Sequence, residues 1–205
     1  ITTKLPWEIQ AALPESNLTA QGSLDALGAT SNDRLLIRGG TSSVGMAAAS
    51  IAAGHGITVA ATTRSTDKAL TADHVLIDDG ESLAAAVRAI WPEGPSHVLD
   101  LIGARTAVDS LSLVRRGGTV CVSGSLSGWL IPDFEPIAMI PSGTRLTTFH
   151  SKDAAGTTAL QRIVDEVEAG VYRPNLDRVF TLDEIAKAHD HMENNQATGK
   201  IVVIP

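Results

Sequence analysis

Short apolar runs alternate with stretches of helical periodicity along most of this chain. The apolar runs are rich in Val, Ile and Leu and have the length of buried strands, whereas the stretches between them repeat apolar residues every three or four positions. Strands are expected at 35–38, 57–63, 74–77, 97–102, 119–123 and 145–149, with helices at 44–53, 82–90 and 106–114. This alternation indicates an α/β fold with a parallel sheet and helices on both of its faces.

The two ends of the chain depart from this alternation. Residues 157–169 have the pattern of an amphipathic helix that ends at Gly170, a residue suited to a left-handed cap. Thr181 and Glu184 have the spacing of a capping box, which predicts a helix to about residue 193. Short strands are expected at 177–180 and 200–204. We divide the chain into an entry segment (1–28), a central α/β domain (29–156) and a C-terminal segment (157–205), and expect both end segments to pack against something besides the parallel sheet.

Composition supports an aliphatic core and narrows the functional classes. Hydrophobic residues make up 43% of the chain and aromatic residues only 3%, which suits buried parallel strands. The net charge of -7 argues against a nucleic-acid partner. The single cysteine, Cys121, excludes a disulfide within the chain and a cysteine-rich zinc site.

The longest apolar stretch, 44–63, is interrupted at residues 54–56, so it predicts a helix, a turn and a strand rather than a membrane span. No signal peptide is visible. We therefore expect a cytoplasmic protein without a membrane partner. The sequence begins at Ile1 rather than at a methionine, so whether Ile1 is the native start stays open.

The turn after the first strand carries the strongest candidate chemistry. Gly40, Ser42 and Gly45 occupy the positions of G-x-G-x-x-G, with serine at the middle one. In that motif the first glycine permits the tight turn, a small middle residue lets a pyrophosphate approach the backbone, and the last glycine lets the helix pack close to the strand. The N–H groups and the dipole of the helix then attract the anion. The predicted binding residues of this turn are Gly40, Thr41, Ser42, Ser43 and Val44. An ordinary βα turn is the alternative, but the position between the first strand and the first helix favours a dinucleotide site.

Several segments, taken in order, carry a family resemblance. They are 11–20, 39–45, 98–103 and 117–124, followed by Ala188-His189 and 199–203. Residues 39–45 resemble the A-x-x-G-G-V-G phosphate loop of the quinone-oxidoreductase branch of the medium-chain dehydrogenase/reductase superfamily, with Ser42 and Ser43 where that loop usually has paired glycines. The other segments resemble that family's entry helix, its fourth and fifth strands and its C-terminal signature. The resemblance implies a Rossmann-type doubly wound parallel sheet, so that 29–156 is a dinucleotide-binding domain. The N- and C-terminal segments would belong to a largely absent GroES-like catalytic domain.

Two features depart from that family. Its sizeable N-terminal GroES-like domain, which supplies much of the active-site wall, is absent here. Only ten residues, 64–73, join the second and third strands, whereas a parallel crossover usually needs about 10–12 residues or more and contains a helix. Either the protein has a deletion here, or residues of a flexible loop are missing from the sequence. We favour the second explanation.

The end of the second strand bears on the choice of nicotinamide cofactor. An acidic residue there binds the ribose hydroxyls in NAD enzymes, whereas basic residues accommodate a 2′-phosphate. The predicted binding residues at this strand end are Thr63, Arg64, Ser65 and Lys68. A guanidinium fork, a hydroxyl and an ammonium suit a phosphate, so we predict NADP(H) rather than NAD(H). Asp67 and Asp78 count against the phosphate, and both basic residues could instead be ordinary exposed charges.

By resemblance, the ends of the fifth and sixth strands would line the nicotinamide pocket. The residues predicted there are Ser123, Gly124, Leu126, Phe149 and His150, with a plain turn as the alternative for the segment after the fifth strand. We assign no catalytic residue, although His150 is a candidate because histidine is the residue type most often used for proton transfer near neutral pH. Asp100, inside an apolar strand, is expected to satisfy local backbone donors. We assign no metal ligands, because the resembled branch generally works without catalytic zinc.

These observations predict the NADP(H)-binding domain of an oxidoreductase. The resembled branch transfers hydride from nicotinamide to a quinone, enone or similar carbonyl-conjugated acceptor, so the cofactor carries the chemistry and the protein orients it. The isolated chain can be inactive. The alternatives are a non-catalytic NADPH-binding module and an enoyl-reductase fragment of a larger synthase. The family commonly dimerises through an edge strand of the cofactor domain, so we also predict a homodimer through 145–149.

Overall fold

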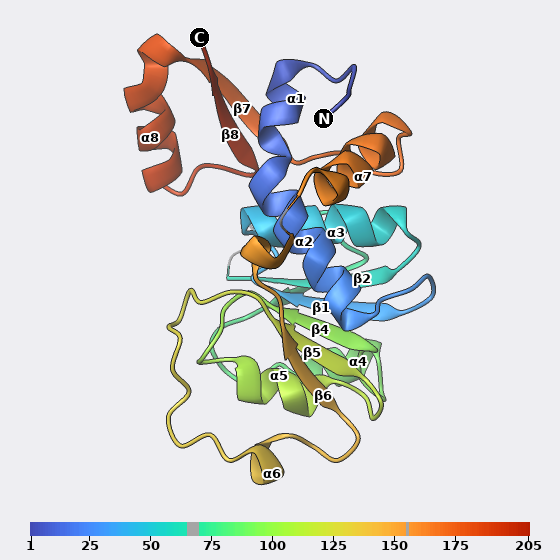
Figure 1. Cartoon of the computed structure of the whole chain (residues 1–205). Coiled ribbons are helices and arrows are strands. Elements are labelled where there is room, and N and C mark those ends of the chain that lie inside the picture. The colour runs from blue at the N-terminus through green and yellow to red at the C-terminus, as the bar shows by residue number, and fades with distance from the viewer. Residues whose placement is uncertain (65–69, 155) are drawn as a thin grey trace.

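A six-stranded parallel sheet forms the centre of the molecule (Figure 1). The computed structural model describes residues 1–64, 70–154 and 156–205. The strands are β1 (Arg34–Arg38), β2 (Thr58–Thr63), β3 (His74–Ile77), β4 (His97–Asp100), β5 (Thr119–Val122) and β6 (Arg145–Thr148), and every neighbouring pair is parallel. Their order, β3-β2-β1-β4-β5-β6, is that of a doubly wound Rossmann sheet. The predicted fold class is therefore confirmed.

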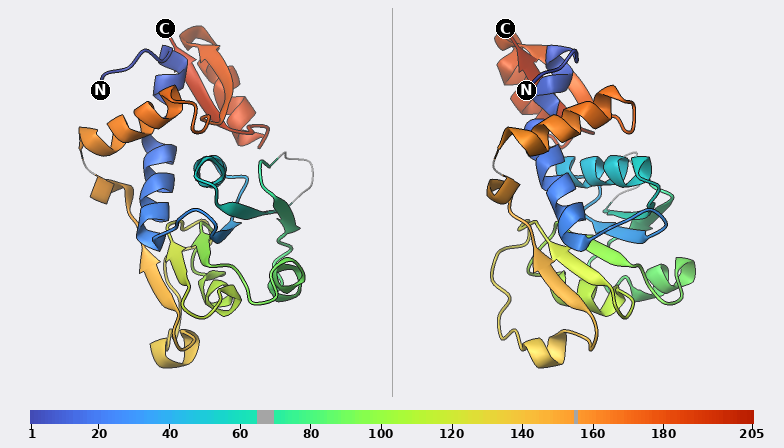
Figure 2. Two further views of the ribbon diagram at one scale, coloured as in Figure 1. Left: turned by 90° about the vertical axis from the view of Figure 1, so that its right-hand side faces the viewer. Right: turned by 45° about the vertical axis from the view of Figure 1, so that its right-hand side comes forward.

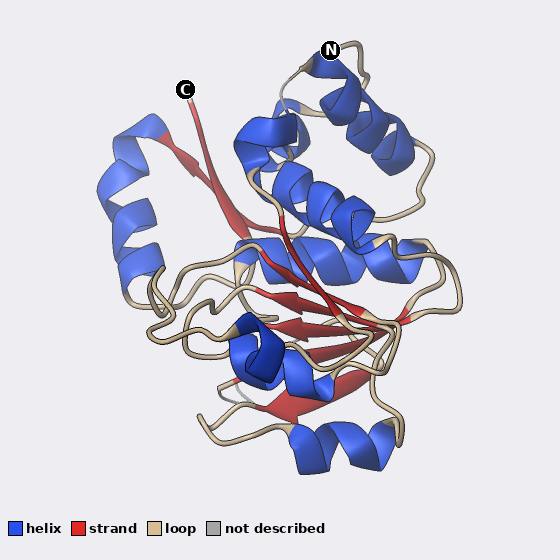
Figure 3. Cartoon of the chain, turned by 60° about the horizontal axis from the view of Figure 1, so that its bottom comes forward, coloured by secondary structure: helices blue, strands red, loops and turns tan. Residues whose placement is uncertain are grey.

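Helices cover both faces of this sheet (Figure 3). One face carries α2 (Pro14–Leu27), α3 (Ser43–Gly54) and α7 (Thr157–Glu168), and the other carries α4 (Ala84–Ile90) and α5 (Ala107–Leu113). The connection between β5 and β6 contains the short α6 (Pro136–Met139), and a 3-10 turn, η1 (Ser151–Ala154), follows β6.

The alternation of side chains along each strand explains the two layers. Leu35 and Ile37 of β1 pack beneath α2 and α3, whereas Leu36 packs on the side of α4 and α5. All three are fully buried. Successive side chains of a strand point to opposite faces, so a strand buried on both faces is apolar throughout. Small alanines at 47–49 let α3 lie close to the strands and to α2.

The entry segment corrects one expectation, because α2 packs against the parallel sheet. It crosses α3 and contacts β4, β5 and β6. The buried side chains of Ala20, Leu24 and Leu27 belong to the same core as the strands. Only α1 (Trp7–Ala12) behaves as expected of that segment, since it contacts the C-terminal strands as well as α2.

The last part of the C-terminal segment, residues 176–204, forms a small unit of its own (Figure 2), whereas α7 of the same segment packs on the parallel sheet beside α2. Strands β7 (Leu176–Thr181) and β8 (Lys200–Ile204) pair in parallel and are joined through η2 (Leu182–Glu184) and α8 (Ile185–Glu193). The capping box between Thr181 and Glu184 is present, as predicted. Gly170 has the predicted left-handed φ of 74° after α7. Both chain termini lie at this end of the molecule.

The short link between β2 and β3 does not prevent their parallel pairing, in which Ala60 lies opposite His74. Its described residues, Arg64 and 70–73, contain no helix. Asp73 Oδ2 accepts a hydrogen bond from the Val59 N–H at 2.7 Å, which fixes the end of the link to β2.

Among the described residues, no helix combines the length and the apolar character needed to cross a bilayer.

Candidate functional site

The carboxyl edge of the parallel sheet opens onto two adjoining hollows. The first, of about 510 Å³, lies over the ends of β1, β2 and β4. The second, of about 430 Å³, lies over the ends of β5 and β6 and beside α2. Ile102 lines the first hollow and Gly103 the second, so the turn after β4 forms their common wall. Ligands of open α/β sheets bind at this edge, where the strand order reverses.

The glycines of the turn after β1 do not all have the roles that the motif predicts. The left-handed residue is Gly39, with φ of 82°, and not Gly40. A Cβ on Gly40 would lie 2.8 Å from Ala61 Cβ and 3.0 Å from the Thr62 carbonyl oxygen, so Gly40 is small because β2 passes close to it. A Cβ on Gly45 would collide with the Gly39 carbonyl oxygen. Gly45 therefore permits the close approach of helix and strand, as expected.

The start of α3 offers unpaired backbone donors. Ser42 is its N-cap: the Ser42 Oγ accepts from the Gly45 N–H at 3.1 Å and donates to the Gly39 carbonyl at 2.8 Å. Within the described part of the chain, the N–H groups of Thr41, Ser43 and Val44 make no hydrogen bond. Thr41 lines the first hollow and Val44 the second. The helix N-terminus therefore lies between the two hollows, where free N–H groups and the helix dipole favour an anion.

Two exposed arginines line the first hollow. Arg64 follows β2 as predicted, beside Thr63, and Arg105 lies in the turn between β4 and α5. No ion pair of either guanidinium is found among residues 1–64, 70–154 and 156–205. Arg105 was not predicted, although its place two residues after Gly103 at a strand end was an available signal. The predicted Ser65 and Lys68 lie outside the described residues.

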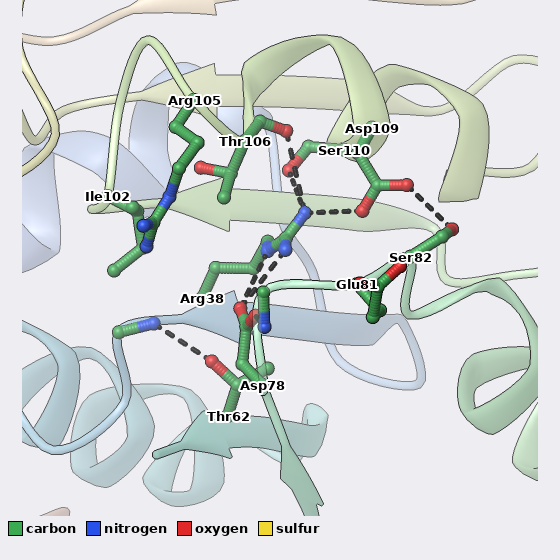
Figure 4. A network of polar contacts seen from close by, with 12 residues as sticks. Arg38, Thr62, Asp78, Glu81, Ser82, Ile102, Arg105, Thr106, Asp109 and Ser110 are labelled. Atoms are coloured by element: carbon green, nitrogen blue, oxygen red, sulfur yellow. Dashed lines mark hydrogen bonds and ion pairs between the residues drawn. The ribbon is translucent and has the colours of Figure 1, made fainter.

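Asp78 also lines the first hollow, but its charge is paired (Figure 4). Arg38 Nη2 lies 3.0 Å from Asp78 Oδ2, and Arg38 Nη1 lies 2.6 Å from Asp109 Oδ2. Arg38 itself is only 1% exposed. Sequence reasoning counted Asp78 against a phosphate and did not single out Arg38. An arginine that ends an apolar strand was the signal for a buried partner.

The second hollow contains four of the five residues predicted for the nicotinamide pocket, namely Ser123, Gly124, Phe149 and His150. Leu126 instead lines the first hollow and is 74% exposed. The Ser123 and Ser23 hydroxyls are 2.8 Å apart, which fixes the end of β5 to α2. The Phe149 ring occupies the space that a Cβ on Gly22 of α2 would need.

Three further residues reach the hollows from outside the central domain, and one of them is the exposed Glu15 of α2, which lines the second hollow. Thr19 of α2 is 7% exposed and lines the second hollow, and among the described residues its Oγ1 has no hydrogen-bond partner. Buried hydroxyls are normally paired, so this one is suited to a ligand. Asn195, with φ of 56°, lines the first hollow from the loop after α8. Sequence reasoning missed all three, although a threonine on the buried face of a helix was an available signal.

Asp100 has the structural role expected of it. It is fully buried, and its carboxylate accepts from the Ile102 and Gly103 N–H groups and from the Thr106 and Ser110 hydroxyls. These bonds shape the turn after β4 that separates the hollows.

Cys121 is also buried, and its burial raises the pKa of the thiol.

Comparison with known proteins gives the family context of this site. A family model described as zinc-binding dehydrogenase matches residues 70–203. A 2-haloacrylate reductase of a Burkholderia species is 30% identical over 166 residues, which cover 73% of this chain and 49% of that protein. A probable quinone oxidoreductase of Schizosaccharomyces pombe is 22% identical over 221 residues, which cover 100% of this chain and 65% of that protein. A mycobacterial protein solved in complex with NADPH superposes on 100% of this chain and 66% of its own with a TM-score of 0.83 at 23% identity. The chain thus spans about half to two thirds of the length of these relatives.

Proposed function

Because this chain belongs to the zinc-binding dehydrogenase family and has the cofactor-domain fold of the medium-chain dehydrogenases, we propose that it is the NADP(H)-binding part of a quinone or enone reductase. The observation that carries the proposal is the start of α3, whose free N–H groups lie between two hollows. A dinucleotide has the matching shape, with an anionic pyrophosphate between two nucleoside ends. The mycobacterial relative complexed with NADPH and the probable quinone oxidoreductase support the choice of cofactor and acceptor.

The residues present fit such a cofactor at three points. The N–H groups of Thr41, Ser43 and Val44 would hold the pyrophosphate. Arg64 and Arg105 would hold a 2′-phosphate in the first hollow. The second hollow would take the nicotinamide end, where the unpaired hydroxyl of Thr19, the Ser123 hydroxyl and the exposed His150 supply polar groups.

When bound, a reduced nicotinamide supplies a hydride to the acceptor, so the protein has to bind and orient rather than react. The wall of the second hollow is largely apolar and includes Val44, Ile131 and Leu146. Such a wall excludes water from one face of a bound ring while polar groups at the strand ends fix its orientation. We assign no proton transfer to any described residue.

Zinc, which the family's description names, does not fit the described residues. A zinc site needs at least three His, Cys, Asp or Glu ligands around one point, and no such group occurs among residues 1–64, 70–154 and 156–205. Cys121, the chain's one cysteine, is a buried residue of β5 and is hydrogen-bonded to Ser123. No step of the proposed function is routed through a metal.

The proposal is tested by calorimetric titration of the whole chain with NADPH and with NADH. We expect NADPH to bind more tightly than NADH. Ser43→Pro removes one N–H at the first position of α3, where proline is well tolerated and where Ser42 already has the extended ψ of 159° that a following proline requires. Loss of that charge-assisted hydrogen bond should weaken NADPH binding about tenfold or more.

Ser43→Ala is the matched control, because it removes the side chain and keeps the N–H. It should bind NADPH as the wild type does. If neither NADPH nor NADH binds to the wild-type chain, the proposed function is wrong. If Ser43→Pro binds NADPH normally while remaining folded, the pyrophosphate does not lie at the start of α3.

A further inference from the structure

We propose that Arg38 determines the preference for a 2′-phosphorylated dinucleotide by neutralising Asp78 beneath the ligand hollow. This inference rests on the proposed function and names a residue that sets its cofactor specificity. Arg38 lies at the end of β1 and Asp78 directly after β3, on either side of β2. The pair therefore bridges the two strands that flank β2, and of the two residues only Asp78 lines the first hollow.

Asp78 is placed where a carboxylate would oppose a phosphate. Its N–H donates to the Thr63 carbonyl at 2.8 Å, which holds it beside the end of β2. It lines the same hollow as Arg64. An unpaired carboxylate at this end of the sheet would accept hydrogen bonds from ribose hydroxyls and would repel a phosphate on the same ribose.

Arg38 is held so that its charge acts on Asp78. Its Nε and Nη2 donate to Asp78 Oδ2 at 3.3 and 3.0 Å, and its Nη1 donates to Asp109 Oδ2 at 2.6 Å (Figure 4). The Nη1 also lies 3.4 Å from the Thr106 carbonyl and from the Ser110 hydroxyl. With 2% of its side chain exposed, the guanidinium cannot be a main contact of a ligand. An arginine keeps its proton at any working pH, so this neutralisation is permanent.

The pairing with Arg38 changes two properties of Asp78 that affect dinucleotide binding: its net charge and its capacity to accept hydrogen bonds. Its negative charge is compensated by Arg38, which leaves the charges of Arg64 and Arg105 to dominate the hollow. Its Oδ2 is already occupied by two donors, so it is a poorer acceptor for a ribose hydroxyl. Both effects favour a phosphorylated ribose over a free diol.

Asp109 also affects the charge at Asp78, because both carboxylates pair with the guanidinium of Arg38. Its side chain is 25% exposed, against 11% for Asp78, and its second oxygen accepts from the Ser82 hydroxyl at 2.8 Å. The single positive charge of Arg38 therefore offsets only one of the two negative charges on Asp78 and Asp109. Removing the charge of Asp109 should leave more of the guanidinium's field for Asp78 and make the hollow more positive.

The test is calorimetric titration of NADPH and NADH with Arg38→Gln, Asp78→Asn, the double variant and Asp109→Asn. Arg38→Gln should weaken NADPH binding about tenfold relative to NADH, since it exposes the charge of Asp78. Arg38→Gln/Asp78→Asn should restore the wild-type ratio of the two affinities. Asp109→Asn, an isosteric change at a partly exposed site, should raise that ratio about two- to threefold.

A purely structural Arg38 gives a different result, in which Arg38→Gln weakens both cofactors equally and the double variant restores nothing. That outcome overturns the inference. If Arg38→Gln does not fold, Asp109→Asn provides the test. An unchanged ratio of the NADPH and NADH affinities in Asp109→Asn would then overturn the inference. Failure of the wild-type chain to bind either cofactor would instead refute the proposed function, so the two failures are distinguishable.

Discussion

Arg64, exposed at the end of β2, is one of the two basic residues on which the predicted NADP(H) preference depends, and the other, Lys68, lies outside the described residues. We expect Arg64→Gln to weaken NADPH binding about tenfold and to leave NADH binding unchanged, because a bidentate guanidinium–phosphate contact is lost only with the phosphorylated cofactor. The measurement is the pair of dissociation constants from calorimetry.

The matched control is Arg116→Gln, which removes one exposed arginine from the turn before β5, at the opposite edge of the sheet. It alters the net charge equally but lies far from both hollows, so it should not change the ratio of the two affinities. Equal weakening of NADPH and NADH by Arg64→Gln would mean that Arg64 contacts a part common to both cofactors.

At the same scale, local spacing predicted the residues of the glycine turn but not all of their roles. Gly45 has the role that its position in the motif indicates. The left-handed conformation of Gly39 depends on how the turn passes β2, which a six-residue pattern does not record. Arg38 and Thr19 acquire their significance from partners or hollows formed by segments far away in the sequence, such as Asp78 and Asp109.

At the scale of elements, the junction of β1 and β4 contains a buried histidine that links stability to pH. His97 begins β4, is 9% exposed, and has its Nε2 3.5 Å from Asp33 Oδ2. Burial lowers the pKa of His97; Asp33 opposes this shift, and Arg115 and Arg145 add to it. The folded pKa thus lies below the unfolded value of about 6.5, so the neutral form stabilises the fold above that pH.

This stability should be lost as the pH falls from about 6.5 through the folded pKa of His97, with a limiting slope of about 1.4 kcal/mol per pH unit for one proton. Urea unfolding between pH 5 and 7.5 measures it. His97→Asn should flatten the curve in this window, whereas His150→Asn, at an exposed position, should not. Asp33, whose pKa is lowered by hydrogen bonds from Thr30 against the opposing effect of burial, affects stability only at more acid pH. A curve of unchanged slope in His97→Asn would contradict this assignment.

The elements themselves were largely predictable, because their signals are local. The strand at 74–77 and the strand at 200–204 have the predicted bounds, and the others differ by one or two residues at their ends. What the sequence did not reveal was the packing of α2 on the sheet. The buried face of α2 includes Ser16, Asn17 and Ser23, which dilute its hydrophobic periodicity.

At the scale of the whole molecule, the three parts into which we divide the chain meet at the hollows. The entry segment supplies Thr19, the central domain supplies both strand edges, and the C-terminal segment supplies Asn195. The division itself remains a proposal. Cofactor binding should therefore depend on the fold of the whole chain and not on residues 29–156 alone.

The edge of the sheet formed by β6 has features that support the predicted homodimer. Strand β6 pairs with β5 on one side, and no strand pairs with its other side among the described residues. The Arg145 N–H donates to the Gly118 carbonyl of the turn before β5 at 3.0 Å, so in a parallel pair the N–H groups of Leu146 and Thr148 face away from β5. Large apolar side chains are exposed on the connection that leads into β6, among them Trp129 at 82% and Ile137 at 100%. Unpaired strand edges and exposed apolar groups are both features of association surfaces.

We expect light scattering at micromolar concentration to give twice the chain mass of 21.4 kDa. Thr148→Pro removes an outward N–H while the bonds to β5 stay, so it should convert the dimer to a monomer, because an isologous pairing loses that bond on both copies. Thr148→Val keeps the N–H and should remain dimeric. A wild-type monomer would refute the homodimer. A dimer that survives Thr148→Pro would place the interface elsewhere, and the exposed side chains of the β5–β6 connection would then be the next surface to test.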